Sequence, residues 1–157
     1  MKKDKFNLKQ EYSNLKYKLP KFDDLDYEFE ISLANIKNKE FLLRNIRRRI
    51  NDKIILFCRI IENLIYPNQN NLITMFELKS FSEEEKDNML KLYKRLMKFE
   101  RKSLILDVNP DDKEDFEYIN NVYRLWKEFK DEILKITEKM ERSWGIEDKP
   151  LKDVYFG

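Results

Sequence analysis

The chain has 157 residues, of which 41% are hydrophobic and 39% charged, and its formal net charge is +2. This length suits one domain with a substantial buried core, and the hydrophobic content argues against a wholly disordered chain. Because acids and bases nearly balance, the chain lacks the strong overall positive field of a dedicated DNA-binding domain.

Cysteine content and hydropathy exclude several further classes of protein. Cys58 is the single cysteine, which excludes an internal disulfide and a multi-cysteine zinc site, and its apolar surroundings favour core packing over a reactive thiol. No segment approaches the ~20 apolar residues of a membrane-spanning helix. The start, MKKDKF, has no apolar region after its lysines, unlike a secretion signal. We therefore expect a cytoplasmic protein with no membrane partner.

Residues 1–21 are rich in lysine and end at Pro20, without a clean helical stripe of apolar residues. We favour a mobile or loosely docked, solvated arm. The alternative is an arm that binds an acidic partner or nucleic acid, with its aromatic side chains stacked on bases. Those side chains are Phe6, Tyr12 and Tyr17.

Apolar and polar residues alternate strictly over residues 25–33, which is typical of a strand. Phe22, Leu25 and Phe29 also fit one face of a helix, so strand and helix both remain open. No second strand of comparable quality follows, and a lone strand would leave its backbone groups unpaired. We predict an extended or mixed segment whose acidic residues could pair with the arginine-rich stretch that comes next.

The stretch from Lys39 to Tyr66 predicts one long helix. Apolar residues recur at steps of three or four from Leu43 to Leu64, which places them on a single face. In the second half the other faces are apolar as well, which indicates a central helix covered on several sides. The helix should end at Tyr66, before Pro67.

Three more helices follow along the chain. Residues 68–81 predict a short helix that caps one end of a bundle. Ser82 and Glu85 have the spacing of a capping box, which predicts a long helix to about Leu106. Asn109 as the capping residue, with Pro110 at the first helical position, predicts a third long helix that stops at Gly145.

These elements predict an all-α fold: an antiparallel bundle of three long helices plus one short helix, with an extended or mixed N-terminal segment. The expected organisation is a lysine-rich arm (1–21), one helical-bundle domain (22–145) and a C-terminal tail (146–157). The tail is apolar enough that we expect it to dock on the bundle. We recognise no protein family in these motifs.

Catalytic motifs are missing. The chain has no histidine, which removes Ser-His-Asp and Cys-His catalysis and the Glu-x-x-His metal pairs of di-iron bundles. Its two glycines cannot form a phosphate-cradling loop. A carboxylate-only magnesium site remains conceivable at a cluster of acids that more often cap a helix. These acids are Asp111, Asp112, Glu114 and Asp115. We predict no enzyme activity, no metal and no cofactor.

An arginine cluster is the best candidate for a binding site for phosphate or an acidic partner. It consists of Arg44, Arg47, Arg48, Arg49 and Lys53. Arginine forms bidentate pairs with both phosphates and carboxylates. We favour pairing with the chain's own acids, at Glu40, Asp52 or segment 23–30, over an acidic protein partner and over nucleic acid. The basic residues between Lys91 and Lys102 could extend the surface, which supports nucleic acid.

The predicted function is therefore non-catalytic. We expect a helical protein-interaction protein, an adaptor or subunit of a complex, that binds another protein or a second copy of itself. The alternative is a nucleic-acid-binding accessory protein that uses the basic helix faces.

Overall fold

The computed structural model describes residues 6–145, and every regular element in that range is helical. Three long helices, with a short helix between the first and second, confirm the predicted all-α bundle. The predicted tail, 146–157, lies outside the described residues. The elements in order are α1 (Leu8–Ser13), α2 (Phe22–Phe29), the 3-10 helix η1 (Ile31–Ala34), α3 (Leu42–Ile65), α4 (Leu72–Leu78), α5 (Glu83–Val108) and α6 (Asp112–Ser143).

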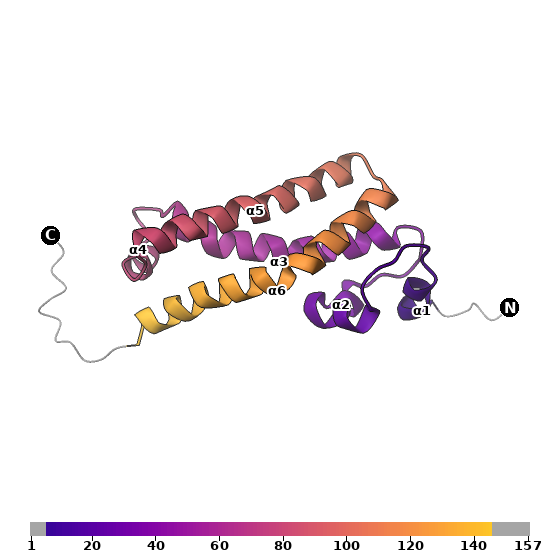
Figure 1. Cartoon of the computed structure of the whole chain (residues 1–157), viewed down its shortest axis with the longest axis horizontal. Coiled ribbons are helices and arrows are strands. Elements are labelled where there is room, and N and C mark those ends of the chain that lie inside the picture. Colours follow the sequence, from indigo (N-terminus) through magenta and orange to yellow (C-terminus); the bar gives the residue numbers. More distant parts are fainter. Residues whose placement is uncertain (1–5, 146–157) are drawn as a thin grey trace, which may run out of the picture.

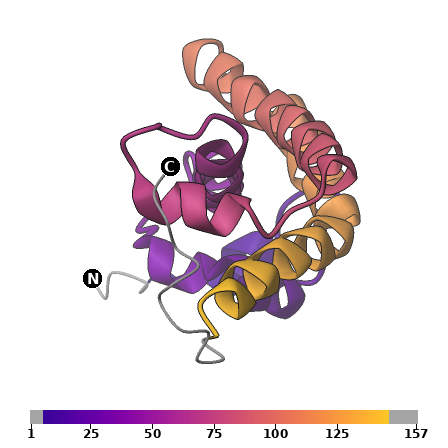
Figure 2. The same ribbon diagram turned by 90° about the vertical axis from the view of Figure 1, so that its left-hand side faces the viewer.

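The long helix α3 is the centre of the bundle. It packs against both α5 and α6, and α5 runs antiparallel to it (Figure 1). Most of the apolar stripe predicted from the sequence is buried: Ile46, Ile50, Ile54 and Ile61 have no exposed surface, whereas Phe57 is partly exposed. α4 lies across the end of α3, as predicted for a short capping helix (Figure 2). No helix in the described range is long and apolar enough to cross a membrane.

Segment 25–33 is helical, so the strand interpretation is wrong. α2 ends at Phe29, Glu30 takes a left-handed conformation at φ 54°, and η1 follows. Leu25 and Phe29, four residues apart, are fully buried, whereas Tyr27 is 83% exposed. Burial therefore follows the helical period rather than the alternation. The alternation suggested a strand only because exposed apolar side chains were taken for core residues.

Residues 6–21 pack against the rest of the chain. Tyr12 is buried in the core and its hydroxyl donates to the Pro20 carbonyl (2.6 Å). The Tyr17 ring stacks on Phe116 of α6 with centroids 4.8 Å apart. Two of the aromatic side chains that could have stacked on nucleic-acid bases are thus engaged within the fold.

The helix ends agree with the sequence signals in part. The capping box of Ser82 and Glu85 is present, with both of its hydrogen bonds. Asn109, however, does not cap α6, because its N–H still bonds to Ile105 and it closes α5 instead. Asp111 takes the capping role, since its extended backbone brings its carboxylate to the amide of Glu114 (2.9 Å).

The last long helix ends at Ser143, two residues before the expected stop at Gly145. Gly145 does not adopt a positive φ, so the chain leaves the helix without the left-handed conformation that favours glycine. The Trp144 ring packs on Phe76, which ties this end of α6 to α4.

Candidate interaction surface

The middle arginine of the predicted site is an interior residue. Arg47 is fully buried, and its guanidinium reaches from α3 to both α5 and α6. Its Nε donates to Asp115 Oδ1 (2.5 Å), its Nη2 to Asp107 Oδ1 (2.6 Å), and its Nη1 to the Ser103 carbonyl (3.0 Å) and hydroxyl. A buried guanidinium keeps its charge and needs this number of partners. Arg47 therefore joins the three long helices and has no free donor face for a ligand.

The pKa values of the two carboxyl groups around Arg47 shift in opposite directions. Burial raises the pKa of the Asp115 carboxyl, and the hydrogen bond from Arg47 offsets only part of that effect. Burial also acts to raise the pKa of Asp107, but hydrogen bonds from Arg47 and Arg48 outweigh it and hold that pKa below its ordinary value. Asp115 Oδ2 is buried without a hydrogen-bond partner among the described residues.

The remaining basic residues of the predicted site point to different neighbours. Arg48 Nε donates to Asp107 (2.9 Å) at the edge of the buried network. Arg49 Nε donates to the Phe29 carbonyl (3.1 Å), and Lys53 pairs with the Glu30 carboxylate (3.2 Å). Arg49 and Lys53 thus satisfy acceptors at the C-terminus of α2, where cations are favoured.

Arg44 lies apart from these pairs. Its guanidinium carbon lies 4.7 Å from the centroid of the Phe41 ring, and its buried Nε has no hydrogen-bond partner within residues 6–145. The five predicted side chains therefore do not gather on one exposed face. Four contact groups of this chain through ion pairs, and the fifth stacks on an aromatic ring.

The acids considered for a magnesium site each make a different contact within the fold. Asp111 caps α6, Glu114 pairs with Lys102, and Asp115 pairs with Arg47. Within residues 6–145 no group of three or more acids or cysteines is arranged to hold a metal ion. Cys58 lies in the core, and burial raises the pKa of its thiol to about 11.

A row of cations lies on the outer face of α5, the side turned away from α3. We call it the α5 basic row: Lys91, Lys94, Lys98 and Arg101, all exposed. Arg101 pairs with its neighbour Glu100, whereas none of the three lysines forms an ion pair with another described residue. No described element covers this side of α5 (Figure 2).

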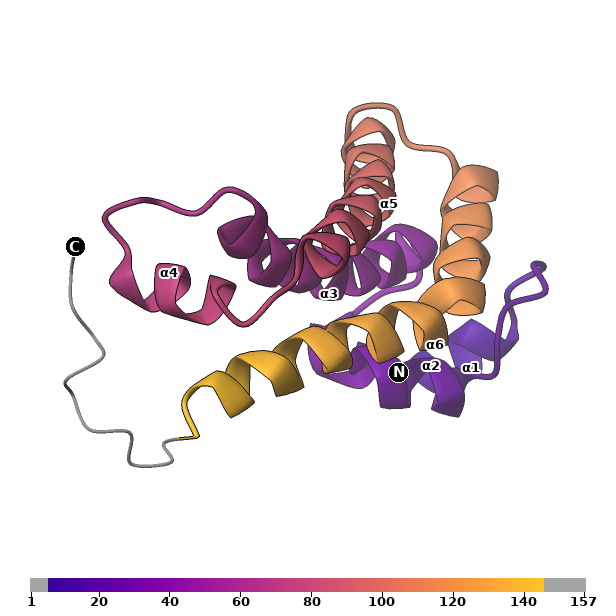
Figure 3. The ribbon, with the colours of Figure 1, turned by 60° about the vertical axis from the view of Figure 1, so that its left-hand side comes forward.

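The same face becomes apolar toward the turn into α6. We call this end the α5 apolar tip: Leu104, Ile105 and Val108, which are 45%, 57% and 86% exposed. The tip and its flanks at Arg101 and Asn109 line a shallow hollow of about 390 Å³. The turn that joins α5 to α6 stands away from α2 (Figure 3).

Sequence reasoning noted the basic row only as an extension of the arginine cluster and missed the tip. A signal was present in the spacing. The inward stripe of α5 passes through Leu92, Leu96, Ser103 and Leu106, all of them buried. The tip residues fall outside that stripe, so a helical projection would have placed them on the outer face.

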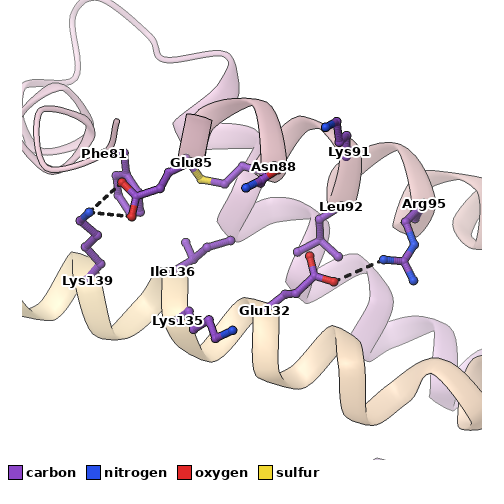
Figure 4. A pocket seen from close by; sticks show the side chains of 11 residues that line it. Phe81, Glu85, Asn88, Lys91, Leu92, Arg95, Glu132, Lys135, Ile136 and Lys139 are labelled. Atoms are coloured by element: carbon purple, nitrogen blue, oxygen red, sulfur yellow. Dashed lines mark hydrogen bonds and ion pairs between the residues drawn. The ribbon is translucent and has the colours of Figure 1, made fainter. Parts of the chain in front are cut away.

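A groove between α5 and α6 is the other hollow of note, at about 360 Å³. Its floor is apolar, with Phe81, Leu92 and Ile136. Two ion pairs cross it, Glu85 with Lys139 (2.7 Å) and Arg95 with Glu132 (3.3 Å), as Figure 4 shows. The hydrogen bond from Lys139 lowers the pKa of Glu85. The chain's own side chains thus span this groove, whereas nothing described spans the outer face of α5.

Comparison with known proteins gives no relative: no family model, no curated protein and no solved structure matches the chain.

Proposed function

We propose that the protein is a non-catalytic interaction protein, an adaptor or subunit of a complex, that binds a partner protein through the outer face of α5. The observation that carries the proposal is the α5 apolar tip. Three branched aliphatic side chains stand together in water at the end of a helix whose inner face is packed. Covering them would remove apolar surface from water, which is the main driving force for protein association.

The α5 basic row supports a protein partner in a second way. Charged residues rim many protein interfaces, where they orient the partner and speed its arrival more than they add affinity. Three exposed lysines with no acid paired to them would perform this role beside an apolar contact. Arg47, Arg48 and Arg49 of α3 are less suited to it, because acids of this chain already pair with them.

Nucleic-acid binding is the second candidate function, and the same row is the observation that favours it. Four cations along one helix face could contact successive phosphates. In that case affinity would fall steeply with salt. It would also be insensitive to the apolar tip, because aliphatic side chains do not stack on bases.

Site-specific photo-cross-linking tests the proposed function. A photoreactive amino acid replaces Ile105 in the full chain, and the matched control carries it at Leu134 on α6, which is 54% exposed against 57% for Ile105. The experiment uses cells of the chain's own source. We expect a discrete protein adduct at position 105 that is several-fold weaker at 134. An adduct of twice the chain's mass would identify a second copy as the partner.

Equal products at the two positions, or none at either, would contradict the proposal. Cross-links to nucleic acid rather than to protein, formed from position 105 and from a photoreactive residue placed in the α5 basic row, would favour the second candidate instead.

A further inference from the structure

We propose that the outer face of α5 recognises an acidic amphipathic helix of another protein. Carboxylates of that helix would pair with the α5 basic row, and its apolar end would cover the α5 apolar tip. This inference rests on the proposed function and names the chemical class of the partner.

The layout of the face sets the size of the partner. The row advances by three, four and three residues from Lys91 to Arg101, which keeps its side chains on one side of the helix. From Lys91 to Val108 the face runs about 26 Å at 1.5 Å per residue, or roughly five turns. A helix of similar length can lie along it and place apolar side chains in the hollow beside Leu104.

Charge and apolar surface must act together on this face. Exposed ion pairs each contribute little, because water and salt screen them, so the row alone would give weak and salt-sensitive contact. The tip alone would accept any apolar surface. An acidic helix with an apolar end uses both, because its carboxylates fix the register while its apolar residues supply affinity. Glu83, Glu84 and Asp87 are acids on the same side of α5, but all three lie at the start of the helix, ahead of the row.

The row and the tip on α5 of a second copy do not complement this face. In an antiparallel pair of α5 helices, the two-fold axis would pass near Lys98 and Arg101, because these residues lie at the middle of the face. The cations of both copies would then meet at the centre. In a parallel pair each cation would stand against its own counterpart. Like charges across an interface disfavour both arrangements.

Nucleic acid and membranes also fit the face less well. A phosphate backbone would be attracted to the row but would leave the tip uncovered, and neither the row nor the tip contains an aromatic residue for stacking on bases. A helix that lies in a membrane surface carries apolar and basic residues on different sides along its length. On α5 they follow one another along a single side.

Peptide binding to the full chain tests the inference. The probe is a fluorescein-labelled helical peptide about 18 residues long, matched to the length of the face. It carries four glutamates at steps of three and four, followed by two leucines on the same side. A second probe carries them in the reverse order, because the direction of binding is open. We expect one order to bind by fluorescence anisotropy, more tightly at low salt.

Two kinds of variant and two kinds of control probe locate the binding. We expect Lys94→Glu with Lys98→Glu to weaken it at least tenfold, and Ile105→Ser with Val108→Ser to do the same. The matched control Lys113→Glu with Lys127→Glu, exposed lysines of α6, should leave it unchanged. Probes with lysines in place of glutamates, or serines in place of leucines, should bind at least tenfold more weakly.

Several results would overturn the inference. They are no binding in either order, equal binding of the serine probe, and an equal loss in the α6 control. Tighter binding of an oligonucleotide or of vesicles with anionic lipid, abolished by the same α5 variants, would assign the face to that ligand. If the peptides fail while Ile105 still cross-links to a protein, the acidic-helix inference fails and the proposed function stands. If both fail, both are wrong.

Discussion

Replacing Arg47 with methionine keeps an unbranched apolar stem in the core and removes the guanidinium. The change leaves Asp115 buried with neither carboxylate oxygen paired, and Asp107 keeps only Arg48. Removing one partner of a buried ion pair costs about 3–5 kcal/mol. The free energy of unfolding of a typical domain is about 5–15 kcal/mol, so the variant should lose a large part of its stability.

A second substitution separates the ion pair from simple packing. In the double variant Arg47→Met with Asp115→Leu, no buried charge is left without a partner, so we expect most of the lost stability to return. A remaining loss of stability of up to about 1 kcal/mol should persist, because Asp115 also lies in the first turn of α6, where an acid is favoured. Arg48→Met is the matched control, and its half-exposed pair with Asp107 should contribute no more than about 1 kcal/mol.

Urea unfolding followed by far-ultraviolet circular dichroism measures the parent, Arg47→Met, Asp115→Leu, the double variant and Arg48→Met, with free energies extrapolated to water. A loss of stability no larger in Arg47→Met than in Arg48→Met would show that the buried pairs of Arg47 do not stabilise the fold. Losses of the two single substitutions that simply add in the double variant would show that Arg47 and Asp115 are not coupled.

Three further outcomes follow from single contacts. Ser82→Ala should lower the free energy of unfolding by about 1 kcal/mol, because it removes the cap of α5, and thermal melting measures this; an unchanged melting temperature would count against the cap. Glu85→Gln keeps the capping box but weakens the pair with Lys139. Because that pair lowers the pKa of Glu85 in the folded state, its contribution is present above about pH 4.5 and is lost as the pH falls through the lowered pKa. Urea unfolding of both proteins should therefore show a difference at neutral pH that shrinks as the pH is lowered below 4.5, and a constant difference would contradict the assignment. The thiol of Cys58 should react with an alkylating reagent about a hundredfold more slowly than an ordinary cysteine, because its pKa rises from 9.0 to about 11; fast labelling of the folded chain would refute its burial.

Local patterns predicted much of this fold. The spacing of isoleucines in α3 and the Ser82 box each depend on residues within a few turns, so the sequence displays them directly. The helical period of Leu25 and Phe29 was visible too, but the alternation around them competed with it. Exposed Tyr27 and Leu33 created that alternation, and nothing local marks an apolar residue as exposed.

The arginine site shows what local patterns leave open. Arg47 pairs with Asp115, 68 residues away, and only the packing of α3 against α6 brings the two together. The same packing buries Arg47, so the arginines do not form one exposed basic surface. On α5 the cations are visible in the sequence, but the predicted helix stopped at about Leu106, before Val108, and nothing local marks Ile105 as exposed. Whether an apolar residue is core or surface depends on neighbouring helices that the sequence of one helix does not reveal.

The binding surface is inferred to lie on α5 and not at the basic end of α3. Cross-linking yield at Ile105 tests it most directly when two matched neutralisations are compared, Lys94→Gln with Lys98→Gln and Arg48→Gln with Lys53→Gln. We predict that the protein adduct falls several-fold in the first variant and stays at the parental level in the second. An adduct that is lost only in the second variant would contradict the account and return the site to the arginines of α3.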